Sequence, residues 1–354
     1  MSATFSPIDV RGLQIPNRLW VSPMCQYSAV DGVVGDWHLM HLGSLATGGA
    51  GLIIAEATAV SPEGRISIAC PGLWNDSQVT AWRRVTSFVH DQSALIGVQL
   101  AHAGRKASTM QPWAPHPFAD ANNGGWEAVA PSKIAFGHYP TPRALDASGI
   151  AMVTEDFARA ARNAETAGFD VLEIHAAHGY LLHQFMSPLS NQRDDEYGGS
   201  FEGRIRLLLE VSAAVRAVSN LPLFVRISAT DWTPGGWDLA DSVELSRRLK
   251  DLGVDLIDVS SGGNTPDATI TVGPGYQVSL AQEIKSGADI PVSAVGLLTG
   301  AEQIDSLLAS GSIDAVMAAR AFMRNPRFAL QVAEELGEVV PWPIQVERAR
   351  QLRP

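Results

Sequence analysis

The chain has 354 residues, of which 46% are hydrophobic and 18% are charged, so it has ample material for a buried core. Its formal net charge is −11 and it has no lysine- and arginine-rich run, which argues against a nucleic-acid partner because binding phosphates requires a basic surface. Two cysteines, Cys25 and Cys70, are too few for a disulfide framework or a four-thiolate metal site. The start of the chain lacks a secretory signal pattern, and no segment has the ~20 apolar residues needed to span a bilayer. We therefore expect a soluble cytoplasmic protein with no membrane partner.

Eight short β-rich segments follow one another along the chain, with helical segments between them. Each is almost continuously apolar, which is typical of parallel strands that are covered on both faces. The predicted strands span residues 18–24, 51–58, 94–102, 170–176, 222–228, 255–261, 291–296 and 315–321.

The segments between the strands show helical periodicity. Residues 154–168 end at Gly168, where a helix C-cap belongs; residues 200–219 begin at Ser200, a good N-cap; and residues 239–254 form a third amphipathic segment. Eight successive β–α units predict an α/β fold of the (β/α)8 TIM-barrel type, with a doubly wound open sheet as the alternative.

We expect a single domain over residues 1–354. The interval 103–153 follows the third strand, is rich in proline, glycine, tryptophan and histidine, and shows no helix of its own. It should therefore form an excursion that caps the C-terminal mouth of the barrel, where such enzymes carry their active sites.

Polar residues gather where the predicted strands end. These residues are Cys25, Gln26 and Tyr27; Glu56 and Thr58; Gln99 and His102; His175, His178 and Tyr180; Arg226; and Arg320, with Gly296 at the end of the seventh strand. Because the carboxyl ends of barrel strands share one face, the sequence predicts one pocket there.

His175, His178 and Tyr180 allow three interpretations. They can be ordinary hydrogen-bonded residues, or part of a metal site, which would need a third ligand. The third interpretation is a pair of imidazole donors for a substrate carbonyl, beside a phenol that stays protonated at neutral pH. The spacing alone does not decide between them, but the convergence of polar residues at one face favours a function.

Three other positions have both structural and functional interpretations. Arg226 interrupts an apolar strand, so it either forms a buried ion pair, for example with Glu173, or places a fixed positive charge beside a cofactor that becomes anionic. Gln99, also in an apolar strand, can donate and accept hydrogen bonds. Cys25 is either a small buried apolar residue or a group that tunes a redox cofactor.

The ends of the seventh and eighth strands suggest a phosphate site. Gly296 and the segment before Arg320 lie where barrels bind phosphate through backbone N–H groups, and Arg320 would add a charge-assisted contact. The chain has no glycine-rich dinucleotide fingerprint, which disfavours a Rossmann unit.

Several long segments resemble the Old Yellow Enzyme family of flavoproteins, in particular its thermophilic-like or xenobiotic-reductase branch. The segments that show the resemblance are NRLWVSPMCQYSA, HLGSLATGGAGLIIAEATAVSPEGRIS, GVQLAHAGRKAS, EIHAAHGYLLHQFMSPLSNQRDDEYGGSFEGR and PIQVERAR. Together they extend over nearly the whole chain. The resemblance implies an FMN-dependent ene-reductase that uses NADPH or NADH to reduce activated alkenes, namely α,β-unsaturated carbonyls and nitro compounds, in a ping-pong reaction. It implies no metal.

The resemblance also assigns roles to individual residues. It implies that His175 and His178 hold the activating group of the alkene, Tyr180 supplies the proton, Tyr27 assists substrate binding, and Cys25 modulates the flavin. The residues implied to bind FMN are Ser22, Pro23, Met24, Cys25, Ala57, Gln99 and Arg226 at the ring, and Gly296, Ala319 and Arg320 at the phosphate.

Near the C-terminus, Arg348 matches a residue that reaches into a neighbouring subunit's active site, which implies a homodimer or homotetramer. The chain departs from the family pattern at Ala319, where glycine is usual, and at Val346, where an aromatic residue is common. We expect the extra methyl of Ala319 to be tolerated if its φ is negative. A non-catalytic flavin-binding barrel and a metal-dependent barrel hydrolase are the alternative functions.

Overall fold

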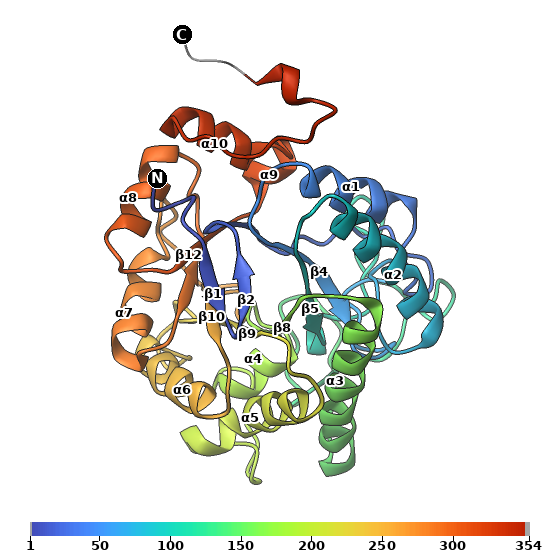
Figure 1. Ribbon diagram of the computed structural model, residues 1–354. Coiled ribbons are helices and arrows are strands. Elements are labelled where there is room, and N and C mark those ends of the chain that lie inside the picture. Colours follow the sequence, from blue (N-terminus) through green and yellow to red (C-terminus); the bar gives the residue numbers. More distant parts are fainter. Residues whose placement is uncertain (1, 351–354) are drawn as a thin grey trace.

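The computed structural model describes residues 2–350, and its centre is a closed barrel of eight parallel strands (Figure 1). Around the barrel the strands run in the order β10, β11, β12, β3, β4, β5, β8 and β9. Their bounds are β3 Leu19–Val21, β4 Ile53–Ala59, β5 Ile96–Ala101, β8 Val171–Ala176, β9 Leu223–Ser228, β10 Leu256–Ser260, β11 Val292–Ala294 and β12 Ala315–Ala318. The predicted TIM barrel is confirmed, and the open-sheet alternative is wrong.

Helices surround the barrel and cover the outer faces of its strands (Figure 1). This packing explains why the strands are apolar on both faces: all eight are buried along their full length. The helices are α1 Asp36–Ala46, α2 Asp76–Asp91, α3 Ala147–Ala167, α4 Leu181–Met186, α5 Phe201–Val218, α6 Leu239–Asp251, α7 Val278–Ala288, α8 Ala301–Ala309, α9 Arg320–Arg324 and α10 Phe328–Leu336. The predicted caps at Ser200 and Gly168 are also confirmed.

The barrel interior changes from apolar to polar along the strands. Near the strand starts, Trp20 stacks on Phe224 in an apolar cluster that includes Leu256 and the antiparallel hairpin of β1 (Ile8–Val10) and β2 (Leu13–Ile15). Two residues further along β9 and β10, on the same side of each strand, stand Arg226 and Asp258. The hairpin and the aromatic pair therefore close one end of the barrel, and charged residues occupy the other.

The excursion after β5 differs from the prediction. It contains a short 3-10 turn, η1 (Gly104–Lys106), and two short strands, β6 (Val129–Ala130) and β7 (Arg143–Ala144). Helix α3 begins at Ala147, seven residues before the predicted start, so the expectation that 103–153 has no helix is wrong. The cause is Asp146, whose side chain accepts a hydrogen bond from the N–H of Gly149 and caps the helix there.

Within residues 2–350, no helix combines the length and the hydropathy needed to cross a membrane. The prediction of one domain over residues 1–354 extends past the described part at both ends. It stays a prediction.

Candidate active site

The C-terminal end of β8 brings His175, His178 and Tyr180 together. The ring centroids of His175 and His178 lie 5.1 Å apart with the planes at 85°, and those of His175 and Tyr180 lie 4.9 Å apart at 78°. His175 is the penultimate residue of β8, and α4 begins immediately after Tyr180. The short turn between these elements therefore gathers three side chains that the sequence spacing had only grouped.

Both histidines are neutral in this setting. Burial lowers the pKa of His175 and of His178 well below the usual value, and the positive charge of Arg226 lowers both further. The Nδ1 atom of His175 accepts a hydrogen bond from the N–H of Ala177 at 3.3 Å, so its proton resides on Nε2. The Nε2 atom of His178 lies 2.7 Å from Oγ of Ser260, at the end of β10.

Tyr180 keeps its proton, and a lysine lies beside its ring. Burial raises the pKa of Tyr180 well above its usual value. The Nζ atom of Lys106, on η1, is 5.2 Å from the centre of the Tyr180 ring and donates to the carbonyl oxygen of His178 at 2.9 Å. Burial, with a smaller effect from Arg105, lowers the pKa of Lys106 to about 8. Sequence reasoning missed Lys106, although it lies in the segment GVQLAHAGRKAS after the third predicted strand.

Arg226 forms a buried ion pair, but not with the residue that the sequence suggested. Its Nε lies 2.9 Å from Oδ2 of Asp258, and its Nη1 donates to Oγ of Ser22 at 3.1 Å. Parallel pairing places Asp258 directly opposite Arg226 on the neighbouring strand, whereas Glu173 is level with Phe224. The expected Glu173 partner is therefore wrong. Asp258 interrupts an apolar strand just as Arg226 does, and that signal could have identified it.

Glu173 instead contacts Gln99. The Nε2 atom of Gln99 donates to Oε1 of Glu173 at 2.8 Å, and both side chains are buried inside the barrel. Burial and the charge of Asp258 raise the pKa of Glu173 to about 8, against the opposing effect of Arg226. The carboxyl group therefore holds its proton at neutral pH. Ala57 lies beside Gln99 in the strand pairing, just after a bulge at Glu56.

The segment after β3 borders the same end of the barrel. Pro23, Met24, Cys25 and Tyr27 are partly exposed there, and the Tyr27 ring contacts Trp113 of the excursion edge to face, with centroids 6.1 Å apart. Burial, followed by the proximity of Cys70, raises the pKa of the Cys25 thiol well above its usual value. Cys25 is therefore a neutral thiol rather than a thiolate nucleophile.

A cavity of 210 Å³ opens at the ends of β11 and β12. Its charged lining residues are Arg226, Arg320 and Arg324, with no acidic residue among them, so its chemistry suits an anionic group such as a phosphate. Gly296 in its wall has a φ of 129°, a conformation that favours glycine. Ala319 in the same wall has a φ of −105°, the negative value that its side chain requires.

Arg348 does not join the other predicted residues within its own chain. It is exposed on the short 3-10 turn η2 (Glu347–Ala349), which begins after Val346. The preceding residues 338–345 line a cavity together with Asn17, Gly51 and Ala94, which precede strands β3, β4 and β5. The terminal segment thus runs along the opposite end of the barrel from His175, and Figure 1 shows it beyond α10.

The residues at the barrel mouth fit a flavin mononucleotide. The arginine-lined cavity suits its phosphate, and the polar layer of Gln99, Ser22 and Arg226 offers donors and a fixed positive charge to a ring that gains electrons. Among residues 2–350, no group of three or more histidine, cysteine or acidic side chains is arranged to hold a metal ion.

Comparisons with known proteins agree on one family. Residues 3–338 match the model of the NADH:flavin oxidoreductase / NADH oxidase family. The chain is 47% identical to an NADH:flavin oxidoreductase of Gibberella zeae, covering 97% of this chain and 88% of the relative, and 46% identical to an NADPH dehydrogenase of a Geobacillus species, covering 97% of each. Among solved structures, an old yellow enzyme homologue from Zymomonas mobilis superposes with a TM-score of 0.78 at 31% identity, covering 98% of this chain and 95% of that one.

Proposed function

Because the chain belongs to the NADH:flavin oxidoreductase / NADH oxidase family, and is thus an FMN-dependent oxidoreductase that uses NADH or NADPH, we propose that it reduces the carbon–carbon double bond of activated alkenes. The observation that carries this proposal is the cluster of two neutral imidazoles and a protonated phenol at the end of β8. The substrates are α,β-unsaturated carbonyl and nitro compounds, whose activating oxygen needs hydrogen-bond donors.

When bound, FMN would supply a hydride, that is, an electron pair together with one hydrogen, to the double bond of the alkene, having received it from NADH or NADPH. The residues proposed to hold it are Ser22, Pro23, Met24, Cys25, Ala57, Gln99 and Arg226 around the ring, and Gly296, Ala319 and Arg320 at the phosphate. The ion pair with Asp258 fixes the guanidinium of Arg226, so its charge is in place before the cofactor binds. The neutral thiol of Cys25 modulates the ring without carrying a charge of its own.

The two histidines bind the activating oxygen of the alkene. The proton of His175 is on Nε2, because its Nδ1 accepts from Ala177. For His178, the proposal assigns the hydroxyl proton of Ser260 to the 2.7 Å contact with Nε2 rather than to the longer 3.4 Å contact with Oε1 of Gln277, which leaves Nδ1 as the donor to substrate. Negative charge grows on the substrate oxygen as the double bond is reduced, so these donors stabilise the transition state more than the ground state.

Tyr180 acts as the general acid, and its Oη gives a proton to the carbon next to the activating group. The raised pKa keeps that proton in place until it is needed. The ammonium group of Lys106, lying against the ring, stabilises the phenolate that remains.

The site draws on further residues for substrate binding. Tyr27, held by Trp113, borders the alkene in the same chain. Arg348 lies on a segment at the opposite end of its own barrel, so it reaches substrate only in the site of a second copy. We therefore propose a homodimer or homotetramer. We also propose a cytoplasmic location, independently of Arg348.

Two anaerobic half-reactions test the proposed function. NADPH should bleach the flavin absorbance, and cyclohexenone should then restore it with loss of the enone double bond. A protein that is reduced but never reoxidised by an enone, a nitroalkene or a maleimide would be a flavin-binding barrel rather than an ene-reductase.

The roles of His175 and His178 have a separate test. Phenol mimics the enolate product, and its binding changes the flavin spectrum. Replacing both histidines with alanine should weaken phenol binding by at least roughly 30-fold, since each lost donor to a charged oxygen is worth more than about 1 kcal/mol. Unchanged phenol binding would contradict the assignment.

A further inference from the structure

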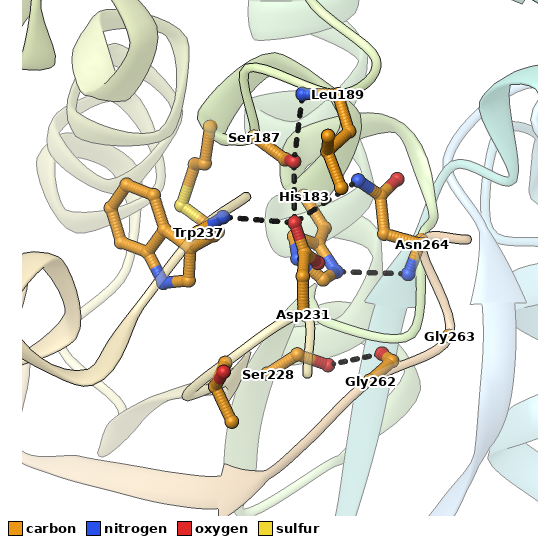
Figure 2. A network of polar contacts seen from close by, with 12 residues as sticks. His183, Ser187, Leu189, Ser228, Asp231, Trp237, Gly262, Gly263 and Asn264 are labelled. Carbon is orange, nitrogen blue, oxygen red and sulfur yellow. Dashed lines mark hydrogen bonds and ion pairs between the residues drawn. The ribbon is translucent and has the colours of Figure 1, made fainter. Parts of the chain in front are cut away.

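A further buried histidine, His183, lies behind the loop of residues 177–180. His183, on α4, has its Nε2 3.0 Å from Oδ1 of Asp231, which follows β9, and both side chains are wholly buried. Figure 2 shows Asp231 surrounded by His183, Ser187 and Trp237. None of these residues takes part in the proposed reaction, and a buried carboxylate is costly unless several donors satisfy it.

The contacts of Asp231 fix the position of the proton on His183. Burial alone would raise the pKa of Asp231, but His183, the hydroxyl of Ser187 at 2.5 Å and the N–H of Trp237 at 2.9 Å lower it to about 2. An ionised carboxylate cannot donate, so the Nε2 of His183 that faces it at 3.0 Å carries the proton, although the angle of this contact lies outside ordinary hydrogen-bond geometry. The Nδ1 atom of His183 is then left as an acceptor.

That acceptor holds one end of a single peptide group. Nδ1 of His183 accepts from the N–H of Gly179 at 2.9 Å, while the carbonyl oxygen of His178 accepts from Nζ of Lys106 at 2.9 Å. The peptide between His178 and Gly179 is therefore held at both its N–H and its C=O. Rotation of this peptide would break both bonds and leave the two groups unpaired in a buried place.

The held conformation is one that the chain would not adopt without support. His178 has a φ of 57°, in the left-handed region that histidine rarely occupies, and Gly179 follows with a φ of 69°. A Cβ on Gly179 would lie 2.2 Å from the carbonyl oxygen of Gly263, in the loop after β10. The side chains of His178 and Tyr180 flank this peptide, so its orientation decides where they point.

We propose that His183, with its tautomer set by Asp231, is a positioning residue that fixes the His178–Gly179 peptide and thereby aims His178 and Tyr180 at the substrate. The effect on substrate rests on the proposed function. The hydrogen bond from Gly179 to His183 does not, because it is a property of the fold itself. The loops after β8 and β9 are thus coupled, because one supplies the residues that meet substrate and the other supplies the anion that orients them.

Two substitutions at His183 separate the roles of its nitrogens. His183→Asn keeps an acceptor bonded to Cγ, where Nδ1 stood, but cannot reach Asp231. His183→Gln can reach Asp231 but lacks the acceptor for Gly179. Both remove the ring, and Asn is one methylene smaller than Gln, so packing alone would make His183→Asn the more damaging of the two. His90→Gln is a control away from the site, because His90 also contacts a carboxylate, that of Asp170 at 2.9 Å, but the pair is partly exposed and lies just before β8, at the other end of the barrel.

The measurements are phenol binding, followed by the flavin spectrum, and the rate of reoxidation by cyclohexenone. His183→Gln should weaken binding and slow reoxidation roughly 10- to 100-fold with FMN content retained, whereas His183→Asn and His90→Gln should stay within about threefold of the wild type. Losses in His183→Asn that equal or exceed those in His183→Gln would overturn the proposal in favour of packing alone, and wild-type behaviour in both would show that His183 positions nothing.

A readout without activity keeps this proposal distinct from the proposed function. In the NMR spectrum of protein with 15N-labelled histidine, the signals that disappear in His183→Asn belong to His183. They should be those of a neutral ring protonated at Nε2. A ring protonated at Nδ1, or a charged ring, could not accept from Gly179 and would overturn the proposal. If the wild type neither bound phenol nor reduced an alkene, the proposed function would fail, and the 15N spectrum would still decide whether His183 holds Gly179.

Discussion

Glu173 offers a test of the polar layer inside the barrel through the pH dependence of stability. Its pKa rises from 4.5 to about 8 on folding, mainly through burial, so the native carboxyl holds a proton that the unfolded chain has released. Between these values the folded state binds more protons, and stability is therefore lost as the pH rises from 4.5 through about 8. The full cost of ionising the buried group is on the order of 5 kcal/mol.

Glu173→Gln removes this pH dependence while keeping an oxygen that can accept from Gln99. In urea titrations at saturating FMN, the wild type should lose roughly 4 kcal/mol more than the variant between about pH 5 and pH 9. Glu302→Gln, at an exposed position on α8, is the control and should follow the wild type. Parallel curves for the wild type and Glu173→Gln would refute the reasoning, because they would mean that Glu173 is not held protonated in the folded protein.

Gly179→Ala should lower the free energy of unfolding by about 1–3 kcal/mol from backbone strain alone, and by more where its Cβ meets Gly263; an unchanged Tm would contradict the close approach. The rate of alkene reduction should decline as the pH rises through about 8, because Lys106 loses its charge there; Lys106→Met should be about 2- to 30-fold slower at pH 7, with no inflection near pH 8. If the variant keeps that inflection, another group is responsible for it. Arg348→Ala should raise the KM for alkene by about tenfold without changing FMN content, and an unaltered KM would place Arg348 outside the site.

The fold was predictable because its main signal is local. Each barrel strand is a continuous apolar segment followed by a turn. All eight predicted segments overlap the observed strands by at least three residues. The start of α3 was missed because Asp146 and Ser148 have short polar side chains, which are also typical of loops. In the structure, Asp146 caps the helix and also accepts a hydrogen bond from the hydroxyl of Ser148. A cap and a turn use the same residue types, so composition does not distinguish them.

The site was predictable where its residues are close together in the sequence. It was less predictable where the pairing of different strands brings the residues together. His175, His178 and Tyr180 share one turn, so their spacing indicated the cluster. The partner of Arg226 depends on the register between β9 and β10, which no spacing within one strand reveals, and Asp258 was missed for that reason. Lys106 was missed because only folding brings η1 against the end of β8. The role of Arg348 depends on a second copy of the chain and stays a prediction.

The most direct test of the proposed reaction follows both half-reactions of Tyr180→Phe in a stopped-flow instrument. Reduction of the flavin by NADPH needs no proton from Tyr180, so its rate should stay within about twofold of the wild type. Reoxidation by cyclohexenone should slow roughly 100- to 10,000-fold, the usual contribution of a positioned general acid. Equal slowing of both steps, or normal reoxidation without the phenol, would contradict the assignment of Tyr180 as the proton donor.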